Sequence, residues 1–255
     1  MAKAATAGLR VETALFTAAE LDELMAALQN LYDLGSVPGC FEVNPHAEDP
    51  LERWPRMMHP HRVSEVAMRY MLHPKLEPVL REMLGDTPIA AQSMFYWKPP
   101  GGRGQALHQD NYYLRAAPTT CVAAWLAIDP ADRENGGLFV VPGSEELPVF
   151  CPEDADLSVS FANELVRVPA GLEAVLAGLE PGDVLFFGGS VIHGSEPNRT
   201  KDRFRRSFIC HYVGESAREI SWFYKPLYRF DGTEVDLADA TGGGPCGDLE
   251  APGPH

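Results

Sequence analysis

Two side chains that often bind metal ions stand close together in the segment 105–113. They are His108 and Asp110, with one residue between them. In an extended strand, residues two positions apart point to the same face, so both side chains could reach one ion. An imidazole together with a carboxylate suits a divalent ion such as Fe(II). The pair therefore predicts two ligands of a metal site.

A third ligand has to come from elsewhere, and His193 is the best candidate. It follows a turn at Gly182-Asp183 and an apolar run that predicts a strand. Two histidines and one carboxylate form a facial triad with open coordination positions. Two of these positions suit a bidentate co-substrate and one suits dioxygen. We therefore expect His108, Asp110 and His193 to be both the metal ligands and the catalytic residues.

Three arginines, Arg203, Arg205 and Arg206, follow His193 in a chain that is otherwise acidic. An arginine on the next strand can bind a carboxylate through two parallel hydrogen bonds. A 2-oxoglutarate molecule that chelates the metal through its 2-oxo acid end needs such a partner at its distal carboxylate. We expect Arg205 to be that partner.

Each of these residues has an ordinary explanation when it is taken alone. A single His-x-Asp is most often a surface or structural feature, His193 could be a core histidine, and Arg205 could be a solvated charge. His46 and Glu48 have the same spacing, but they lie in a proline-rich loop without a strand pattern. The order of the elements favours the triad. The other histidines have no carboxylate at a spacing that supports a ligand pair: His59, His61, His73, His211 and His255.

The segments that must position these residues predict a mainly β fold with flanking helices. After Thr87, short apolar runs are bounded by Gly, Pro, Asn and Asp, and most spacings leave no room for crossover helices. A sandwich or jelly roll follows more naturally than a parallel sheet. The predicted strands are Ile89–Trp97, Cys121–Ile128, Leu138–Val141, Val184–Phe187 and Ser207–Val213.

The first third of the chain predicts helices. Thr17 and Glu20 form a capping-box pattern, and leucines follow at helical spacing up to Gly35. Two more helices are expected at 64–72 and 76–84. An insertion at 148–179 is expected to hold a helix near 172–176, and the tail at 242–255 has little to bury, so we expect it to be mobile or to lie over the surface.

The composition argues against several classes of partner. The net charge of −15 repels polyanions, so neither nucleic acid nor an anionic membrane surface is expected. No stretch approaches the roughly 20 apolar residues of a membrane span, and residues 1–16 lack an apolar run of signal-peptide length. Five widely spaced cysteines predict free thiols in a reducing compartment, so the cytoplasm is the expected location. Nothing in the sequence indicates the oligomeric state.

Taken together, these motifs resemble the phytanoyl-CoA dioxygenase family of Fe(II)/2-oxoglutarate oxygenases. The resemblance covers about residues 88–215, and the N-terminal part more loosely. It rests on these segments: Lys98-Pro99-Pro100, His108-Gln109-Asp110, Ala124-Trp125-Leu126-Ala127, Asn135-Gly136-Gly137-Leu138, Val141-Pro142-Gly143-Ser144, Gly182-Asp183-Val184-Leu185-Phe186-Phe187, His193-Gly194-Ser195 with Asn198, and Phe204-Arg205-Arg206.

The resemblance implies a double-stranded β-helix, a cupin-like jelly roll, and one oxygenase domain over 1–255. That domain would have a helical part at 1–87, a core at 88–215 and a C-terminal extension at 216–255. It also implies the triad and the Arg205 anchor, with Met94, Trp125 and Ser195 lining the 2-oxoglutarate pocket and Gln92 nearby. For Met94 and Trp125, core packing is an equally good explanation. Two assignments stay open: Arg203 or Arg206 as the anchor, and Arg56, His59 or Arg62 as a basic residue supplied by the N-terminal part.

The expected activity is that of an iron- and 2-oxoglutarate-dependent dioxygenase acting with O2. It would oxidise an unactivated C–H bond of a small organic substrate, such as a natural-product or metabolite intermediate, and release succinate and CO2. Tyr96, Trp97, Tyr112 and Tyr113 are candidates for the substrate side. Because the carboxylate ligand is present at Asp110, oxygenation is favoured over halogenation. The alternative is a metal-binding jelly roll without redox chemistry, or a sensor without turnover.

Overall fold

One wall of the molecule is a large antiparallel sheet. The computed structural model describes residues 8–118, 120–242 and 244–247. In the large sheet the strand order is β1-β10-β5-β12-β3-β14-β15, and β2 pairs with β3. These strands are β1 (Leu9–Glu12), β2 (Met57–Met58), β3 (Pro88–Tyr96), β5 (Val122–Ala127), β10 (Val184–Gly188), β12 (Ser207–Gly214), β14 (Leu227–Arg229) and β15 (Glu234–Val235).

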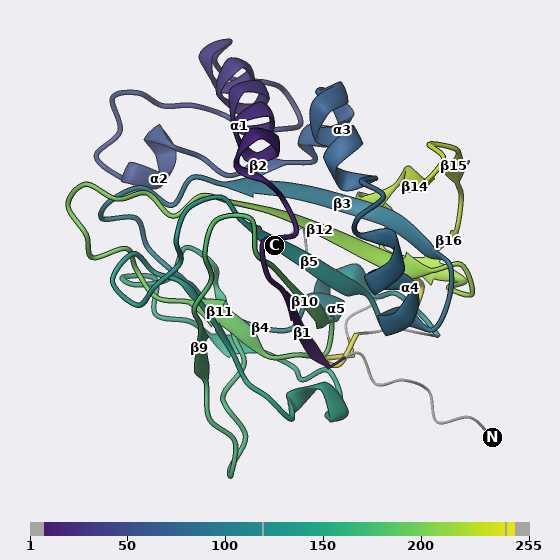
Figure 1. Cartoon of the computed structure of the whole chain (residues 1–255). Helices are drawn as coiled ribbons and strands as arrows, with labels where there is room; N and C mark the ends of the chain where they lie inside the picture. Colours follow the sequence, from purple (N-terminus) through teal and green to yellow (C-terminus); the bar gives the residue numbers. More distant parts are fainter. Residues whose placement is uncertain (1–7, 119, 243, 248–255) are drawn as a thin grey trace.

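A smaller antiparallel sheet faces the first, in the order β4-β11-β6-β9. Its strands are β4 (Gln105–His108), β6 (Leu138–Val140), β9 (Val175–Ala177) and β11 (His193–Ser195). Figure 1 shows β4, β9 and β11 below the long strands β3, β5 and β12. Two short pairs lie outside both sheets: β7 (Glu153–Asp154) with β8 (Glu164–Leu165), and β13 (Glu219–Ile220) with β16 (Ala238–Asp239). The fold is the predicted jelly roll.

Three of the predicted helices begin and end close to where the sequence predicts. Thr17 caps α1 (Ala18–Asp33) in a complete capping box, and Ser64 caps α3 (Glu65–Met71). Gly85, with a φ of 63°, ends α4 (Glu77–Leu84) in the left-handed conformation that glycine adopts readily. The other helices are α2 (Pro50–Arg53), α5 (Asp110–Leu114) and the 3-10 turns η1 (Pro60–Arg62), η2 (Ser144–Glu146) and η3 (Trp222–Tyr224). Among the described residues, none of the helices is long and apolar enough to cross a membrane.

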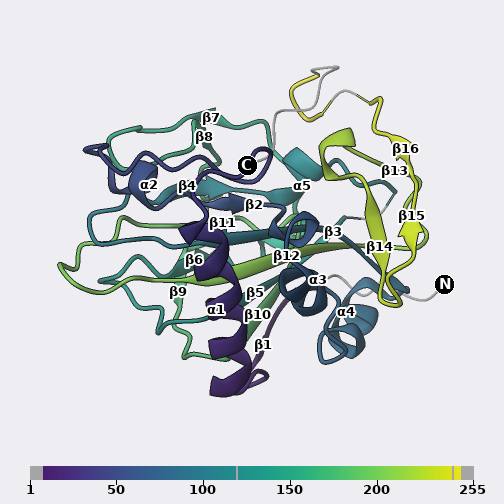
Figure 2. The ribbon, with the colours of Figure 1, turned by 90° about the horizontal axis from the view of Figure 1, so that it is seen from above.

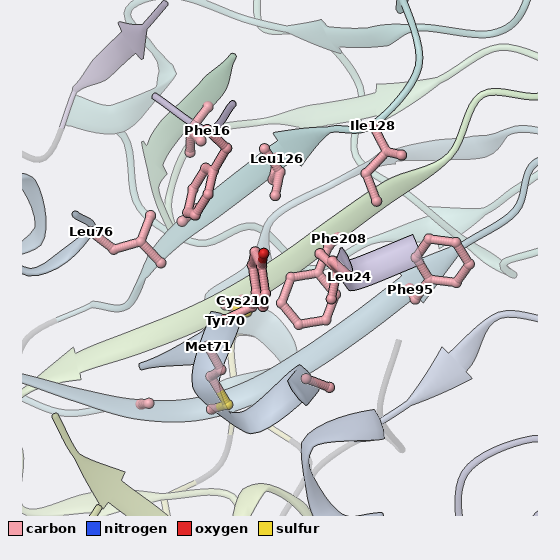
Figure 3. Packing of buried hydrophobic residues seen from close by; sticks show 14 of the residues in the cluster. Phe16, Leu24, Tyr70, Met71, Leu76, Phe95, Leu126, Ile128, Phe208 and Cys210 are labelled. Carbon is pink, nitrogen blue, oxygen red and sulfur yellow. The ribbon is translucent and has the colours of Figure 1, made fainter. Parts of the chain in front are cut away.

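Strand alternation divides the large sheet into two faces. On the outer face, Leu126, Phe208 and Cys210 pack in one buried cluster with Leu24 of α1 and Tyr70 of α3. Figure 3 shows these side chains together between the helices and the sheet. Figure 2 shows α1, α3 and α4 along one side of the molecule, with β13–β16 at one end. The helices thus cover the face of the sheet that points away from the smaller sheet.

The alternate residues of the same strands point to the inner face. Trp125, Phe187 and Ile209 form a second buried cluster with Leu138 and Val140 of the smaller sheet. Because side chains alternate along a strand, each strand directs one set of apolar residues to the helices and the other set to the space between the two sheets. The candidate site residues of β3, β5 and β12 come from this inner set.

The expected helix near 172–176 is absent, and this prediction was wrong. Leu172 lies in a turn, and residues 175–177 form β9, which pairs with β6. The Glu-Ala-Val-Leu-Ala sequence favours a helix locally, but pairing with the free edge of the smaller sheet outweighs that modest preference. The strand β1, whose four residues extend the large sheet beyond β10, was not predicted from the sequence either.

The prediction that all cysteines are free was also wrong. Cys151 and Cys246 form a disulfide, whereas Cys40, Cys121 and Cys210 are buried free thiols. The bridge joins residues 95 positions apart, a pairing that no local spacing reveals. The disulfide and a hydrogen bond from Arg115 Nη1 to the Gly242 carbonyl tie down the described part of the tail. Residues 1–7 and 248–255, on which part of the leader and tail predictions rest, lie outside the described residues.

Candidate active site

The three expected metal ligands converge at one point between the sheets. His108 ends β4 and His193 begins β11, and the two residues are directly paired across these antiparallel strands. Asp110 Oδ1 lies 3.7 Å from His108 Nε2 and 3.4 Å from His193 Nε2. One potential ligand atom from each residue lies within 4.8 Å of the others, and all three residues are buried. The arrangement is compact enough for one ion.

Asp110 reaches this point by a different route from the expected one. The strand ends at His108, Gln109 is extended with a φ of −127°, and Asp110 is the first residue of α5. The two-residue spacing therefore works through a strand-to-helix junction and not along a continuous strand. Gln109 fixes the junction, because its Nε2 donates to the carbonyls of Pro148 and Ser190 and its Oε1 accepts from the Phe150 N–H.

Hydrogen bonds orient both imidazoles. The Nδ1 atoms of His108 and His193 each lie 2.9 Å from a backbone carbonyl oxygen, of Ala106 and Val191 respectively. A carbonyl accepts only, so each Nδ1 carries a proton and each Nε2, which faces Asp110, is the atom available to a metal ion. Gln105 Nε2, at 3.2 Å, is placed to donate to His108 Nε2. A backbone carbonyl on the ring nitrogen opposite the ligand atom is typical of metal-binding histidines.

The carboxylate of Asp110 is held in its ionised form. Burial by itself would raise its pKa, but His193 and His211 lower the pKa well below its ordinary value. His211 was dismissed in the sequence analysis, yet its Nε2 lies 3.1 Å from Asp110 Oδ2. The alternation of side chains along a strand could have indicated the position of His211, because Arg205, Ile209 and His211 all line the same cavity.

The triad opens into a cavity of about 320 Å³. Arg205 lines it and is buried, with its guanidinium carbon 5.2 Å from the centre of the Trp125 ring. Its Nη1 donates to Ser207 Oγ at 2.7 Å and its Nε to the Gly136 carbonyl at 3.2 Å. Burial lowers the pKa of Arg205 to about 10, which leaves it charged at neutral pH. Within the described part of the chain, Arg205 forms no ion pair with a carboxylate.

The other two arginines are already paired. Arg203 Nη1 lies 2.6 Å from Asp132 Oδ2, and Arg206 Nη2 lies 2.7 Å from Asp129 Oδ1. Neither residue is among those that line the cavity. Arg205 lies before β12 and not on the strand, but its side chain is the one of the three that enters the cavity.

Most of the other expected pocket residues also line the cavity. Met94, Trp125 and Ser195 are among the lining residues, but Gln92 is not. Gln92 is fully buried and is paired with His211 across β3 and β12. Tyr96 and Trp97 line the cavity, whereas Tyr112 and Tyr113 are absent from its lining.

The structure separates the three N-terminal basic candidates. Arg56 lines the cavity, with its guanidinium carbon 5.3 Å from the centre of the Phe161 ring. His59 and Arg62 lie outside the lining, and Arg62 donates to the carbonyls of Phe223 and Lys225. Lys98 also lines the cavity, although the sequence indicated it only as the first residue of the Lys98-Pro99-Pro100 motif. Its Nζ donates to Ser195 Oγ at 2.7 Å.

The fold and the site together define a jelly-roll protein with a buried His-Asp-His triad beside an arginine-bearing cavity. The model of the phytanoyl-CoA dioxygenase family matches residues 6–207. The chain belongs to this family.

Individual relatives agree with this assignment. The peroxisomal phytanoyl-CoA dioxygenase of Rattus norvegicus is 30% identical over 181 residues, which are 68% of this chain and 53% of that protein. The chain thus spans about half the length of the curated relatives it matches.

Two solved structures have the same fold. The epimerase SnoN, in complex with Fe3+, alpha ketoglutarate and nogalamycin RO, has a TM-score of 0.65 at 21% identity, covering 83% of this chain and 80% of its own. EctD from S. alaskensis, with 2-oxoglutarate and 5-hydroxyectoine, also has a TM-score of 0.65, at 23% identity, covering 83% of this chain and 73% of its own.

Proposed function

We propose that this protein is an Fe(II)- and 2-oxoglutarate-dependent dioxygenase. In this proposal His108, Asp110 and His193 hold the iron, and Arg205 binds the distal carboxylate of 2-oxoglutarate. The observation that carries it is the shared cavity, which has three converging ligand atoms and a buried arginine without an ion-pair partner among the described residues. A buried charge is normally paired, so the cavity calls for an anionic ligand.

The donor set fits ferrous iron. One carboxylate oxygen and two imidazole nitrogens are the ligands of non-haem iron sites that keep positions open for a co-substrate and dioxygen. When bound, iron with O2 and 2-oxoglutarate supplies the oxidation: one oxygen atom enters the substrate C–H bond, and the other enters succinate as CO2 leaves.

The protein's own contribution is to bind, orient and shield. The carbonyls of Ala106 and Val191 fix the two imidazoles, and the burial of the triad excludes bulk water from the reacting centre. Arg205 sets the direction of the co-substrate, because its guanidinium is fixed by Ser207, Gly136 and the face of Trp125. Because Asp110 retains a carboxylate at the metal, oxygenation is favoured over halogenation.

The proposed substrate is a small organic molecule, such as a natural-product or metabolite intermediate. The cavity of about 320 Å³ has to admit the co-substrate and the reacting part of the substrate. Its lining includes Asp49 and Glu52, and Arg103 is paired with Asp49 at 2.6 Å. This leaves few cations for the phosphates of an acyl-CoA. The small compounds named with SnoN and EctD are of the proposed kind.

A metal-binding jelly roll without redox chemistry is the alternative. It would use the triad but has no need of a carboxylate-binding arginine in the same cavity. The buried position of Arg205 therefore favours the dioxygenase.

The proposal is tested by the release of CO2 from 2-oxoglutarate labelled at C1, in the presence of Fe(II) and O2. We expect the Arg205→Gln variant to raise the KM for 2-oxoglutarate about a hundredfold, because a charge-assisted carboxylate contact is lost. Arg203→Gln is the matched control, since Arg203 pairs outside the cavity, and it should leave the KM unchanged. An equal effect of both substitutions, or none, would contradict the assignment of Arg205.

A further inference from the structure

A second buried cation, Lys98, lies beside Arg205. Its side chain lines the cavity and is 4% exposed. A Cβ atom added to Gly136 would lie 2.6 Å from Lys98 Cε and 2.9 Å from Nζ, so the amine passes directly over that glycine. The carbonyl of the same glycine accepts the hydrogen bond from Arg205 Nε. The two cationic groups therefore converge on Gly136.

The backbone fixes this arrangement. The Lys98 carbonyl accepts hydrogen bonds from the Arg205 N–H at 3.1 Å and from Asn198 Nδ2 at 3.1 Å. Lys98 itself has a φ of 35°, in the left-handed region that is unfavourable for a residue with a side chain. A strained residue held by its neighbours is often a functional one.

Among the described residues, no carboxylate forms an ion pair with Lys98 or with Arg205. Glu196 raises the pKa of Lys98, but its carboxylate already pairs with Arg199 at 2.7 Å and with Arg133 at 3.9 Å. Burial, and then the charge of Arg205, lower the pKa of Lys98 well below its ordinary value. Two buried cationic groups side by side are unfavourable unless an anion joins them.

Ser195 completes the set of donors. Its Oγ accepts from Lys98 Nζ at 2.7 Å and from the Gln105 N–H at 3.3 Å. With both acceptor directions used, the hydroxyl proton remains to be donated. Ser195 also lines the cavity, so Lys98, Ser195 and Arg205 together offer hydrogens to one region.

We propose that Lys98 is a second cationic ligand of the distal carboxylate of 2-oxoglutarate, acting together with Arg205 through the donor set of Lys98, Ser195 and Arg205. The inference rests on the proposed function and adds a co-substrate-binding residue to it. This role differs from a structural one, in which Lys98 would only join the segment after β3 to β11 through its hydrogen bond to Ser195.

The test compares two 2-oxo acids under anaerobic conditions with Fe(II). 2-Oxoglutarate carries the distal carboxylate, whereas 2-oxopentanoate has the same chelating end and a methyl group in its place. The visible charge-transfer band of the chelate reports the Kd of each. We expect Lys98→Met to weaken 2-oxoglutarate binding about 30-fold or more and to leave 2-oxopentanoate binding within about twofold. Lys98→Arg should keep most of the preference, and the exposed Lys201→Met is the control.

Other outcomes overturn the inference. An unchanged 2-oxoglutarate Kd in Lys98→Met means that the amine does not bind the carboxylate, and equal weakening of both acids means that it supports the site only structurally. If the Met variant does not fold, Lys98→Gln, which keeps a donor to Ser195, is judged by the same comparison. Absence of a chelate band in the unaltered protein overturns the proposed function and this inference with it, so the two failures are distinguishable.

Discussion

At the scale of single residues, the two oxygens of Asp110 have different neighbours. Oδ1 faces the Nε2 atoms of His108 and His193, and Oδ2 faces His211 Nε2 at 3.1 Å. In the proposed site Oδ1 would bind the metal, and His211 lies beside the other oxygen. A partner of this kind orients a ligand without touching the ion.

We therefore expect His211→Asn to weaken Fe(II) binding about 10- to 100-fold, which is the usual effect of removing such a partner. Competition with a coloured chelator under anaerobic conditions measures the Kd. His46→Asn is the control, because His46 is exposed and lies in the loop before α2, where its ligand-like spacing to Glu48 has no strand to support it. Identical metal affinity in the unaltered protein and in His211→Asn would show that Oδ2 needs no partner.

We also expect co-substrate binding to depend on pH through Lys98. In the free site its pKa is lowered, first by burial and then by Arg205, while Glu196 raises it. A bound carboxylate would raise the pKa again, so binding takes up a proton between the two values. Affinity should be greatest below the free-site pKa and fall as the pH rises from that pKa to the bound-site pKa. The Kd measured across the pH range in which the protein stays folded checks this. A profile that is equally steep in Lys98→Met would assign the proton to another group.

At the scale of elements, the pairing of β4 with β11 places the two histidines opposite each other. The approach is close, because a Cβ atom on Gly104 would collide with the carbonyl oxygen of Ser195. A glycine at this position lets the two strands meet where the triad forms.

Gly104→Ala should therefore destabilise the fold by about 2 kcal/mol and lower the Tm by about 4–8 °C. Gly178→Ala is the control, since nothing lies within 4 Å of its added Cβ atom, and it should leave the Tm unchanged. Thermal unfolding followed by circular dichroism gives both values. A Tm for Gly104→Ala equal to that of the unaltered protein would mean that the strands can separate at no cost.

The elements also explain what could be predicted from the sequence. The long strands β3, β5 and β12 and the helices α1, α3 and α4 were predicted, because caps and apolar periodicity are local signals. The strand β9 was mistaken for a helix, because its pairing with β6 is a tertiary effect. The contacts of His211 and Lys98 could not be predicted for the same reason, since their partners Asp110 and Ser195 are distant in sequence.

At the scale of the whole molecule, one disulfide joins the tail to the loop beside the candidate site. Cys246 is bonded to Cys151, and the residue that precedes Cys151, Phe150, donates its N–H to Gln109 Oε1 at 2.8 Å. Gln109 stands between His108 and Asp110, two of the proposed metal ligands. The tail is thus connected to the loop that contacts this strand-to-helix junction.

Thiol counting tests this connection. Alkylation of the denatured but unreduced protein should modify Cys40, Cys121 and Cys210, and alkylation after reduction should also modify Cys151 and Cys246. Intact mass and peptide mapping distinguish the two results. Modification of all five cysteines without a reductant would restore the original expectation of free thiols.

The central claim is that a triad-held iron and a carboxylate-binding cavity act together on 2-oxoglutarate. The most direct measurement is the visible spectrum of the anaerobic protein after addition of Fe(II) and 2-oxoglutarate. We expect a weak charge-transfer band that appears only when both are present and is lost in Asp110→Ala. Absence of the band in the unaltered protein, with tightly held zinc and no binding of 2-oxoglutarate, would contradict the claim and favour a metal-binding jelly roll without redox chemistry.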